Sequence, residues 1–218
     1  MRFPADALLF DSDETLVSSL RSVKRVWSRW AESYGMTLEE AMARVEVHGR
    51  PAAEIVAALL PADQAAEGLR RLIDAEVADA LAGGVVPVPG ALALLASLPE
   101  DRWAVVTSSS RRVAGTRLGQ VGIHPKFLIT SDDDITRFKP HPEPFLLAAE
   151  RLGFDPARCV VVEDAPAGLA AGRAAGMATI ALTTTHRPDQ LDADASVADL
   201  TALSARVTTA GDLEITVG

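Results

Sequence analysis

The sequence contains very little cysteine, since Cys159 is the only one among 218 residues. A single cysteine cannot form a disulfide within the chain, and this one lies in the apolar run CVVVE, where a buried, unreactive thiol is usual. The sequence also lacks any apolar run near the roughly 20 residues that span a bilayer, and its N-terminal stretch MRFPADALLF shows no export signal. We therefore expect a cytoplasmic protein with no membrane partner.

Positive charge is also scarce. Asp and Glu number 30 against 21 Lys and Arg, which gives a net charge of −9. Nucleic-acid affinity depends largely on Lys and Arg that neutralise phosphates, so we expect no nucleic-acid partner, although locally placed cations can still bind a small anion. Hydrophobic residues (48%) and charged residues (23%) occur at ordinary globular levels, which excludes extensive disorder. The length allows one large domain or a core with a smaller companion.

What the sequence does contain is a series of short aliphatic runs separated by helical patterns. Continuous apolar runs are typical of parallel strands buried on both faces, whereas half-exposed strands alternate. The pattern predicts an α/β fold, a Rossmann-like parallel sheet with helices on both faces. The predicted strands are residues 7–10, 103–107, 126–130, 159–163 and 178–182.

About ninety residues separate the first two predicted strands, far more than an ordinary crossover connection. This segment contains no convincing strand and shows four successive helical patterns. We expect a four-helix cap domain at residues 17–84, returning through the Gly- and Pro-rich stretch 83–90. Residues 1–16 and 85–218 would then form the α/β core domain.

Local patterns predict further details of these helices and of the C-terminus. Thr37 and Glu40 have the spacing of a capping box at the start of a helix. Trp27 and Trp30 are three residues apart in the first helix and are expected to pack in the interior of the cap. The C-terminal stretch ARVTTAGDLEITVG predicts a hairpin that turns near Gly211.

Polar residues follow the apolar runs, at the predicted carboxyl ends of the strands. Ligands of parallel α/β sheets bind at that edge. Asp11 and Asp13 are two residues apart, a spacing that places both on the same side of an extended segment. The set that this edge would gather is Asp11, Asp13, Thr107, Ser108, Ser109, Lys139, Glu163 and Asp164.

Carboxylates gathered at one edge repel one another and are driven toward protonation unless they share a cation. Oxygen ligands without a His or Cys cluster favour Mg²⁺, which binds a few carboxylates together with substrate phosphate. A lysine and several hydroxyls suit the binding of phosphoryl oxygens and the neutralisation of their charge. The residues therefore indicate phosphoryl transfer.

Four segments, FDSDETL, VVTSSS, FKPHPEPF and VVEDAPAGLAAGRAAGM, resemble in this order the motifs of the haloacid dehalogenase (HAD) superfamily. The resemblance covers essentially the whole chain. The helical insert resembles the C1 cap of the subgroup that contains β-phosphoglucomutase, and HGRPA and VVEDAPAG look most like the sugar phosphatases. The resemblance implies a HAD fold with a four-helix C1 cap, and a Mg²⁺-dependent phosphatase that acts on a small sugar or polyol phosphate through an aspartyl-phosphate.

Carried over residue by residue, the resemblance implies roles for four acidic residues. Asp11 would be the nucleophile and a Mg²⁺ ligand. Asp13 would protonate the leaving alkoxide and then activate water, while its backbone carbonyl binds the metal. Asp164 would be a direct metal ligand, with Glu163 behind it in the second layer around the metal.

The resemblance also implies a phosphate-binding set. Ser108 and Lys139 would hold the phosphoryl group, with Ser109 or Thr107 sharing the hydroxyl role. Ser109 or Ser110 could equally cap the next helix, because serine is a common N-cap residue.

Cap residues would select the substrate. Arg50 is the first candidate for a substrate contact and His48 the second, although a structural role for His48 is equally open. His141 is expected to shape the lysine loop. Glu14 departs from the family pattern, which usually has glycine there, and glutamate has no special freedom at positive φ. We expect the Glu14 side chain to lie in solvent, with a contact to a cap residue as the alternative.

Other reactions within the superfamily fit less well. Its dehalogenases lack the second aspartate, and a phosphonatase would replace Asp13 and use a cap lysine. Val23 occupies the place of the mutase cap histidine, and no lysine occurs between Lys24 and Lys126. Hydrolysis is therefore expected, with a β-phosphoglucomutase-like mutase or a non-catalytic phosphometabolite-binding protein as alternatives. The expected partner is a small phosphorylated metabolite, and the expected state is a monomer.

Overall fold

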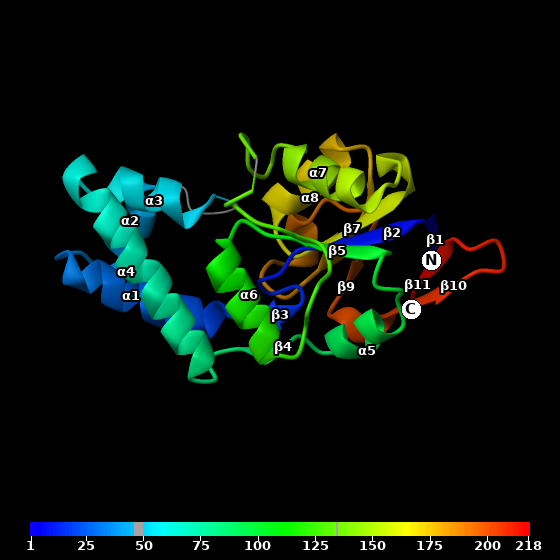
Figure 1. Cartoon of the computed structure of the whole chain (residues 1–218), viewed down its shortest axis with the longest axis horizontal. Coiled ribbons are helices and arrows are strands. Elements are labelled where there is room, and N and C mark those ends of the chain that lie inside the picture. The colour runs from blue at the N-terminus through cyan, green and yellow to red at the C-terminus, as the bar shows by residue number, and fades with distance from the viewer. Residues whose placement is uncertain (46–49, 134) are drawn as a thin grey trace.

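The core of the computed structural model, which describes residues 1–45, 50–133 and 135–218, is a six-stranded parallel sheet (Figure 1). The strand order is β6-β5-β2-β7-β8-β9, so the first core strand lies at the centre with later strands on both sides. This confirms the predicted α/β fold. The strands are β2 (Ala7–Phe10), β5 (Trp103–Val106), β6 (Leu128–Ile129), β7 (Cys159–Glu163), β8 (Ala178–Leu182) and β9 (Ala195–Val197).

Helices cover both faces of this sheet because its central strands are apolar on both sides. In β2, Leu8 and Phe10 belong to one hydrophobic cluster while Ala7 and Leu9 belong to another. Helices α5 and α6 contribute to the first cluster, and α7 and α8 to the second, so the pairs lie on opposite sides of the sheet in Figure 1. Their bounds are α5 (Ala91–Ala96), α6 (Arg111–Gln120), α7 (Glu143–Leu152) and α8 (Pro166–Ala174).

A small antiparallel sheet lies where the two termini meet (Figure 1). The C-terminal hairpin is confirmed, with Gly211 in its turn at a φ of 90°. The N-terminal strand, which the sequence did not predict, pairs with the last strand. The strands are β1 (Arg2–Ala5), β10 (Leu203–Val207) and β11 (Leu213–Val217), and short 3₁₀ turns occur at Pro156–Arg158, Pro188–Gln190 and Leu200–Ala202.

The described residues between β3 and β4 form four helices, and these two strands pair with each other at the base of this segment. We call α1–α4 the helical insert; it occupies the end of the molecule opposite the termini in Figure 1. The predicted return stretch contains β4, so the chain enters and leaves the insert through one two-stranded ladder. The bounds are β3 (Val17–Ser18), α1 (Leu20–Ser33), α2 (Leu38–Arg44), α3 (Ala52–Leu59), α4 (Ala62–Leu81) and β4 (Val86–Pro87).

The interior of the insert follows the predicted helix patterns. The capping box of Thr37 and Glu40 is confirmed at the start of α2. Trp30 is 5% exposed and packs in the insert's own hydrophobic cluster, as predicted. Trp27 meets Trp30 edge to face, with ring centroids 5.8 Å apart, but is only partly buried.

Three predicted core strands, residues 7–10, 159–163 and 178–182, have their predicted bounds. The predicted strand 126–130 is shorter, Leu128–Ile129, because it is an edge strand that pairs with β5 alone. Among the described residues, no helix is both long enough and apolar enough to cross a membrane.

Candidate active site

The carboxyl edge of the sheet and the helical insert enclose a cavity of about 380 Å³. Parallel α/β proteins bind their ligands at this edge, so the cavity is the candidate active site. The structure brings the predicted core residues together in its lining, which includes Asp11, Asp13, Thr107, Ser108, Ser109, Lys139, Glu163 and Asp164.

Lys139 reaches two of these carboxylates. Its Nζ lies 2.6 Å from Oδ1 of Asp11 and 2.9 Å from Oε1 of Glu163, and it also donates to the carbonyl of Val106 at 2.9 Å. All three charged side chains are nearly buried. Because this ammonium is shared by two anions, it holds Asp11 and Glu163 in fixed positions.

The surroundings shift the pKa values of these groups. Burial raises the pKa of Asp11 to about 7, against the opposing effect of Lys139 and with a smaller contribution from Glu163. Burial also raises the pKa of Asp164 well above its usual value, and the charges of Glu163 and Asp11 add to this. Burial lowers the pKa of Lys139, but its two carboxylate partners outweigh this and raise the pKa above its usual value, so Lys139 stays charged. Three buried acids around one lysine leave an excess of negative charge.

Asp164 is oriented by two hydroxyls. Thr15 donates to its Oδ1 at 3.2 Å, and Thr185 donates to its Oδ2 at 2.6 Å. Glu163, one residue earlier, turns the other way: its Oε2 accepts the backbone N–H of Ala165 at 2.7 Å. The two neighbouring acids therefore have different partners, as expected for one that faces the cavity and one that fixes the lysine.

The acids fit a hard divalent cation. Besides burial and Glu163, the charge of Asp11 raises the pKa of Asp164, a conflict that a shared cation would relieve. In residues 1–45, 50–133 and 135–218, no three His, Cys, Asp or Glu side chains form a closed metal cage. Such a cation would therefore depend on two carboxylates, the backbone carbonyl of Asp13, water and the substrate, a shell typical of Mg²⁺.

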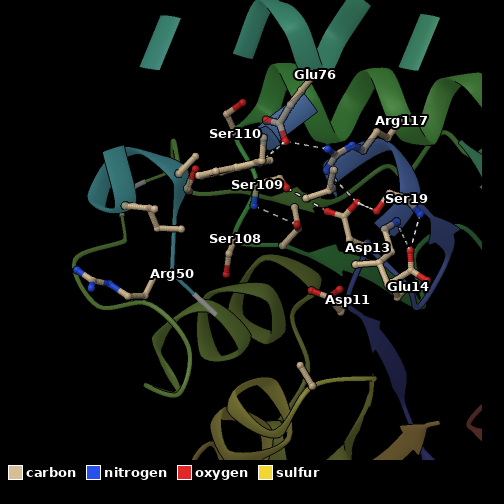
Figure 2. Close-up of a pocket in the computed structure, with 18 of the residues that line it drawn as sticks. Asp11, Asp13, Glu14, Ser19, Arg50, Glu76, Ser108, Ser109, Ser110 and Arg117 are labelled. Carbon is tan, nitrogen blue, oxygen red and sulfur yellow. Dashed lines mark hydrogen bonds and ion pairs between the residues drawn. The ribbon is translucent and has the colours of Figure 1, made fainter. Parts of the chain in front are cut away.

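Asp13 has a different set of partners from Asp11 (Figure 2). Its Oδ1 accepts from the Ser19 hydroxyl at 2.7 Å and from Nη1 of Arg117 at 2.9 Å. Its Oδ2 accepts from the Ser109 hydroxyl at 3.1 Å. Arg117 also donates to Glu76 of the insert at 2.9 Å. The sequence analysis did not identify Ser19, Glu76 or Arg117.

The hydroxyl side chains that follow β5 have different partners and roles. Ser110 is the N-cap of α6 and accepts from the backbone N–H of Val113, which answers the question of which serine caps the helix. Ser109 bonds to Asp13 as described, and Thr107 accepts the backbone N–H of Ser109 at 3.1 Å. Ser108 lines the cavity beside them.

Glu14 does not lie free in solvent, so the favoured expectation was wrong and the alternative holds. It has a φ of 61°, and its Oε1 accepts the backbone N–H groups of Ser19 and Leu20 at 2.5 and 2.6 Å. Ser19 is the N-cap residue of α1 but makes no side-chain cap bond, because its hydroxyl donates to Asp13. Glu14 therefore caps the first helix of the insert from the loop that carries Asp11 and Asp13.

The insert contributes a mainly apolar wall to the cavity. Arg50 lines it, but its Nε is paired with Glu54 at 2.9 Å and its guanidinium extends away from Asp11 and Asp13 in Figure 2. His48 lies outside the described residues. Trp27 packs against the hydrophobic cluster of the insert, as predicted, and also lines the cavity. The apolar lining includes Val23, Trp27, Leu38, Met42, Ile55, Leu69 and Ile73.

His141 has a local structural contact. Its Nδ1 accepts the backbone N–H of Glu143 at 3.2 Å, where α7 begins. This bond joins the loop that carries Lys139 to the start of α7, in agreement with the predicted role in shaping that loop.

Comparison with known proteins assigns the family. Residues 5–176 match the family model of haloacid dehalogenase-like hydrolases. Hexitol phosphatase A of Escherichia coli is 42% identical over 180 residues, 80% of this chain and 81% of the relative. Glycerol-1-phosphate phosphohydrolase 2 of Saccharomyces cerevisiae is 36% identical over 197 residues, 85% of this chain and 78% of the relative.

A solved structure gives the same answer for the fold. CbbY from Rhodobacter sphaeroides in complex with phosphate has a TM-score of 0.77 at 25% identity, and the match covers 90% of this chain and 95% of that one. The chain belongs to the haloacid dehalogenase-like hydrolase family, and the resemblance of the four sequence motifs is confirmed.

Proposed function

We propose that this chain is a Mg²⁺-dependent phosphatase that hydrolyses a small sugar or polyol phosphate through an aspartyl-phosphate on Asp11. The observation that carries the proposal is the pair of carboxylates in one cavity with different partners. Asp11 is held by the charged Lys139, whereas Asp13 is held by hydroxyls and Arg117. One acid can thus attack phosphorus while the other exchanges a proton.

In the first half of the reaction, an oxygen of Asp11 forms a bond to phosphorus as the bond to the substrate oxygen breaks. Asp13 gives its proton to that leaving oxygen and becomes a carboxylate. In the second half, Asp13 takes a proton from water as the water oxygen bonds to phosphorus. The acyl-phosphate bond then breaks, which frees Asp11 and inorganic phosphate.

The remaining residues would hold charge in place during these steps. Lys139 and Ser108 would bind the phosphoryl oxygens, with Ser109 or Thr107 sharing that task. Haloacid dehalogenase-like hydrolases generally use a divalent metal. Asp11, Asp164 and the Asp13 carbonyl would hold Mg²⁺, whose charge would offset that of the phosphoryl group.

The helical insert, within residues 17–84, would act as a cap domain on the core of residues 1–16 and 85–218. Its wall over the cavity would exclude water from the reacting bond and select the leaving group. Arg50 remains the first candidate contact to the substrate beyond the phosphate, with His48 as the second. Relatives named for hexitol and glycerol 1-phosphate support a small polyol or sugar as the leaving group.

Hydrolysis is favoured over phosphoryl transfer to a second hydroxyl. A mutase needs a cap residue that positions and activates the second hydroxyl, and in this cavity the corresponding place is taken by the apolar Val23. We therefore propose water as the acceptor, a small phosphorylated metabolite as the partner, and a monomer as the working form.

The decisive experiment is phosphate release from a panel of hexose, deoxyhexose, pentose and polyol phosphates, with Mg²⁺ or with EDTA. We expect Mg²⁺-dependent release from one sugar or polyol class and none from Asp11→Asn. Activity of Asp11→Asn equal to that of the wild type would overturn the nucleophile assignment. Interconversion of hexose 1- and 6-phosphates without phosphate release would favour the mutase instead.

A further inference from the structure

A buried arginine joins Asp13 to the helical insert. The guanidinium of Arg117 donates from Nη1 to Asp13 at 2.9 Å and from Nη2 to Glu76 at 2.9 Å (Figure 2). Arg117 lies on α6 of the core, Glu76 lies on α4 of the insert, and Asp13 follows β2. One side chain thus connects three segments that are distant in the sequence.

The burial of this group argues against a purely stabilising role. The side chains of Arg117 and Glu76 are 2% and 8% exposed. Buried ion pairs are often no more stabilising than apolar residues of similar volume, because both charges lose their hydration. In addition, Nε of Arg117 has no hydrogen-bond partner among the described residues. An apolar residue would fill this place without these costs, so the charge needs another reason.

The contact between the guanidinium and Asp13 supplies that reason. The two oxygens of Asp13 are held unequally by the residues that the structure describes. Oδ1 accepts from both Ser19 and Arg117, at 2.7 and 2.9 Å, whereas Oδ2 accepts from Ser109 alone among them, at 3.1 Å. Two strong donors fix Oδ1 and so fix the plane of the carboxyl group. This leaves Oδ2, with one longer hydrogen bond, as the oxygen available for exchange of a proton.

We propose that Arg117 is the positioning residue of Asp13, and that Glu76 holds Arg117 in this position from the insert. The orientation of Asp13 then depends on the packing of α4 against α6, so docking of the insert and alignment of Asp13 occur together. The inference rests on the proposed function of Asp13 as proton donor to the leaving oxygen. It assigns roles in this reaction to two further residues, Arg117 and Glu76, neither of which touches the reacting atoms.

The test compares two leaving groups. A sugar or polyol phosphate needs a proton on its departing alkoxide, whereas p-nitrophenyl phosphate releases a stabilised phenolate that needs none. The value of kcat/KM covers the reaction up to departure of the leaving group, so it isolates the step that requires an aligned Asp13. We expect Arg117→Lys to lower kcat/KM by about 100-fold on the alkyl phosphate. The loss on p-nitrophenyl phosphate should be less than about tenfold.

Glu76→Gln should show the same selectivity with a smaller loss of kcat/KM, because Arg117 keeps its bond to Asp13 but loses the ionic partner that holds it from the insert. The double variant Arg117→Met with Glu76→Gln removes both buried charges together and retains a well-packed interface. Its loss of kcat/KM on the alkyl phosphate should equal or exceed that of Arg117→Lys. If the double variant does not fold, Arg117→Lys, which keeps the charge, carries the test.

The matched control is Arg112→Gln. Arg112 lies on the same helix and pairs with Asp74 of α4 at 2.5 Å, but this pair is exposed and does not reach Asp13. It should leave both kcat/KM values nearly unchanged. Equal losses on both substrates in folded Arg117 variants, or no loss on either, would overturn the inference.

Asp13→Asn separates this inference from the proposed function. A selective loss on the alkyl phosphate in Asp13→Asn, without one in the Arg117 variants, would reject the positioning role alone. Absence of selectivity in Asp13→Asn itself would reject the proposed proton donor.

Discussion

The Nζ of Lys139 lies 2.6 Å from Oδ1 of Asp11, and both side chains are almost inaccessible to solvent. The same ammonium lies 2.9 Å from Glu163. One buried cation therefore serves two buried carboxylates, and the geometry of the proposed nucleophile depends on it. Removal of this charge would leave two like charges facing each other in a poorly hydrated place.

Lys139→Met should destabilise the fold and abolish turnover. Removing one partner of a buried ion pair costs about 3–5 kcal/mol, because the other charge is left unpaired. Urea unfolding in EDTA measures this loss. The matched control is Lys126→Met, where the lysine is exposed and the expected change is within about 0.5 kcal/mol. An unfolding free energy for Lys139→Met close to that of the control would contradict the importance of this pair.

Stabilisation by Mg²⁺ should increase with pH. The pKa of Asp11 in the fold is about 7, above its ordinary 3.8, so between these values the folded state holds a proton that the unfolded state has lost. Its contribution is therefore fully present below about pH 4 and is lost as the pH rises through about 7. The pKa of Asp164 is raised as well. Since Mg²⁺ binds the ionised form, it should restore at pH 8 the stability that protons supply at pH 5.

The measurement is the Tm with Mg²⁺ and with EDTA at pH 5 and pH 8. We expect a larger Mg²⁺-dependent rise in Tm at pH 8, and a smaller one there in Asp164→Asn. A rise that is equal at both pH values, or larger at pH 5, would argue against the proposed ligands.

The part of the site that follows strands could be predicted from the sequence. Asp11, Lys139 and Asp164 come after apolar runs whose burial is evident, and the edge of a parallel sheet brings such residues together. The edge strand β9 and the N-terminal β1 were not predicted, because each is short and only partly buried and so shows no continuous apolar run.

Arg117 and Glu76 were missed for a different reason. They lie on helices in separate parts of the chain, and only the packing of α4 against α6 brings them together. A weak signal was present: Arg117 falls four residues after Val113 and directly before Leu118, on the buried side of α6. A charged residue in an apolar stripe indicates a buried partner, but the sequence does not say which one.

Gly168→Ala should disturb the candidate active site by displacing the carboxylate of Glu163. A Cβ at Gly168 would overlap Oε1 of Glu163, the oxygen that accepts from Lys139. The carboxylate must then move, so we expect lower stability and lower kcat. Gly115→Ala is the matched control, since nothing lies within 4 Å of its Cβ and α6 should gain about 0.5–1 kcal/mol. Thermal unfolding and phosphate release measure both, and a neutral Gly168→Ala would show that Glu163 adapts freely.

Glu14 should stabilise its loop despite a backbone conformation that favours glycine. Glu14→Gly relieves the positive φ but leaves the first N–H groups of α1 without this acceptor, which costs about 1–3 kcal/mol. Glu14→Ala loses the acceptor and keeps the strain, so it should be about 1 kcal/mol less stable than Glu14→Gly. Glu14→Gln, which retains an acceptor oxygen, should lie closest to the wild type. Urea unfolding ranks the three variants, and a Gly variant more stable than the wild type would mean that the strain outweighs the cap.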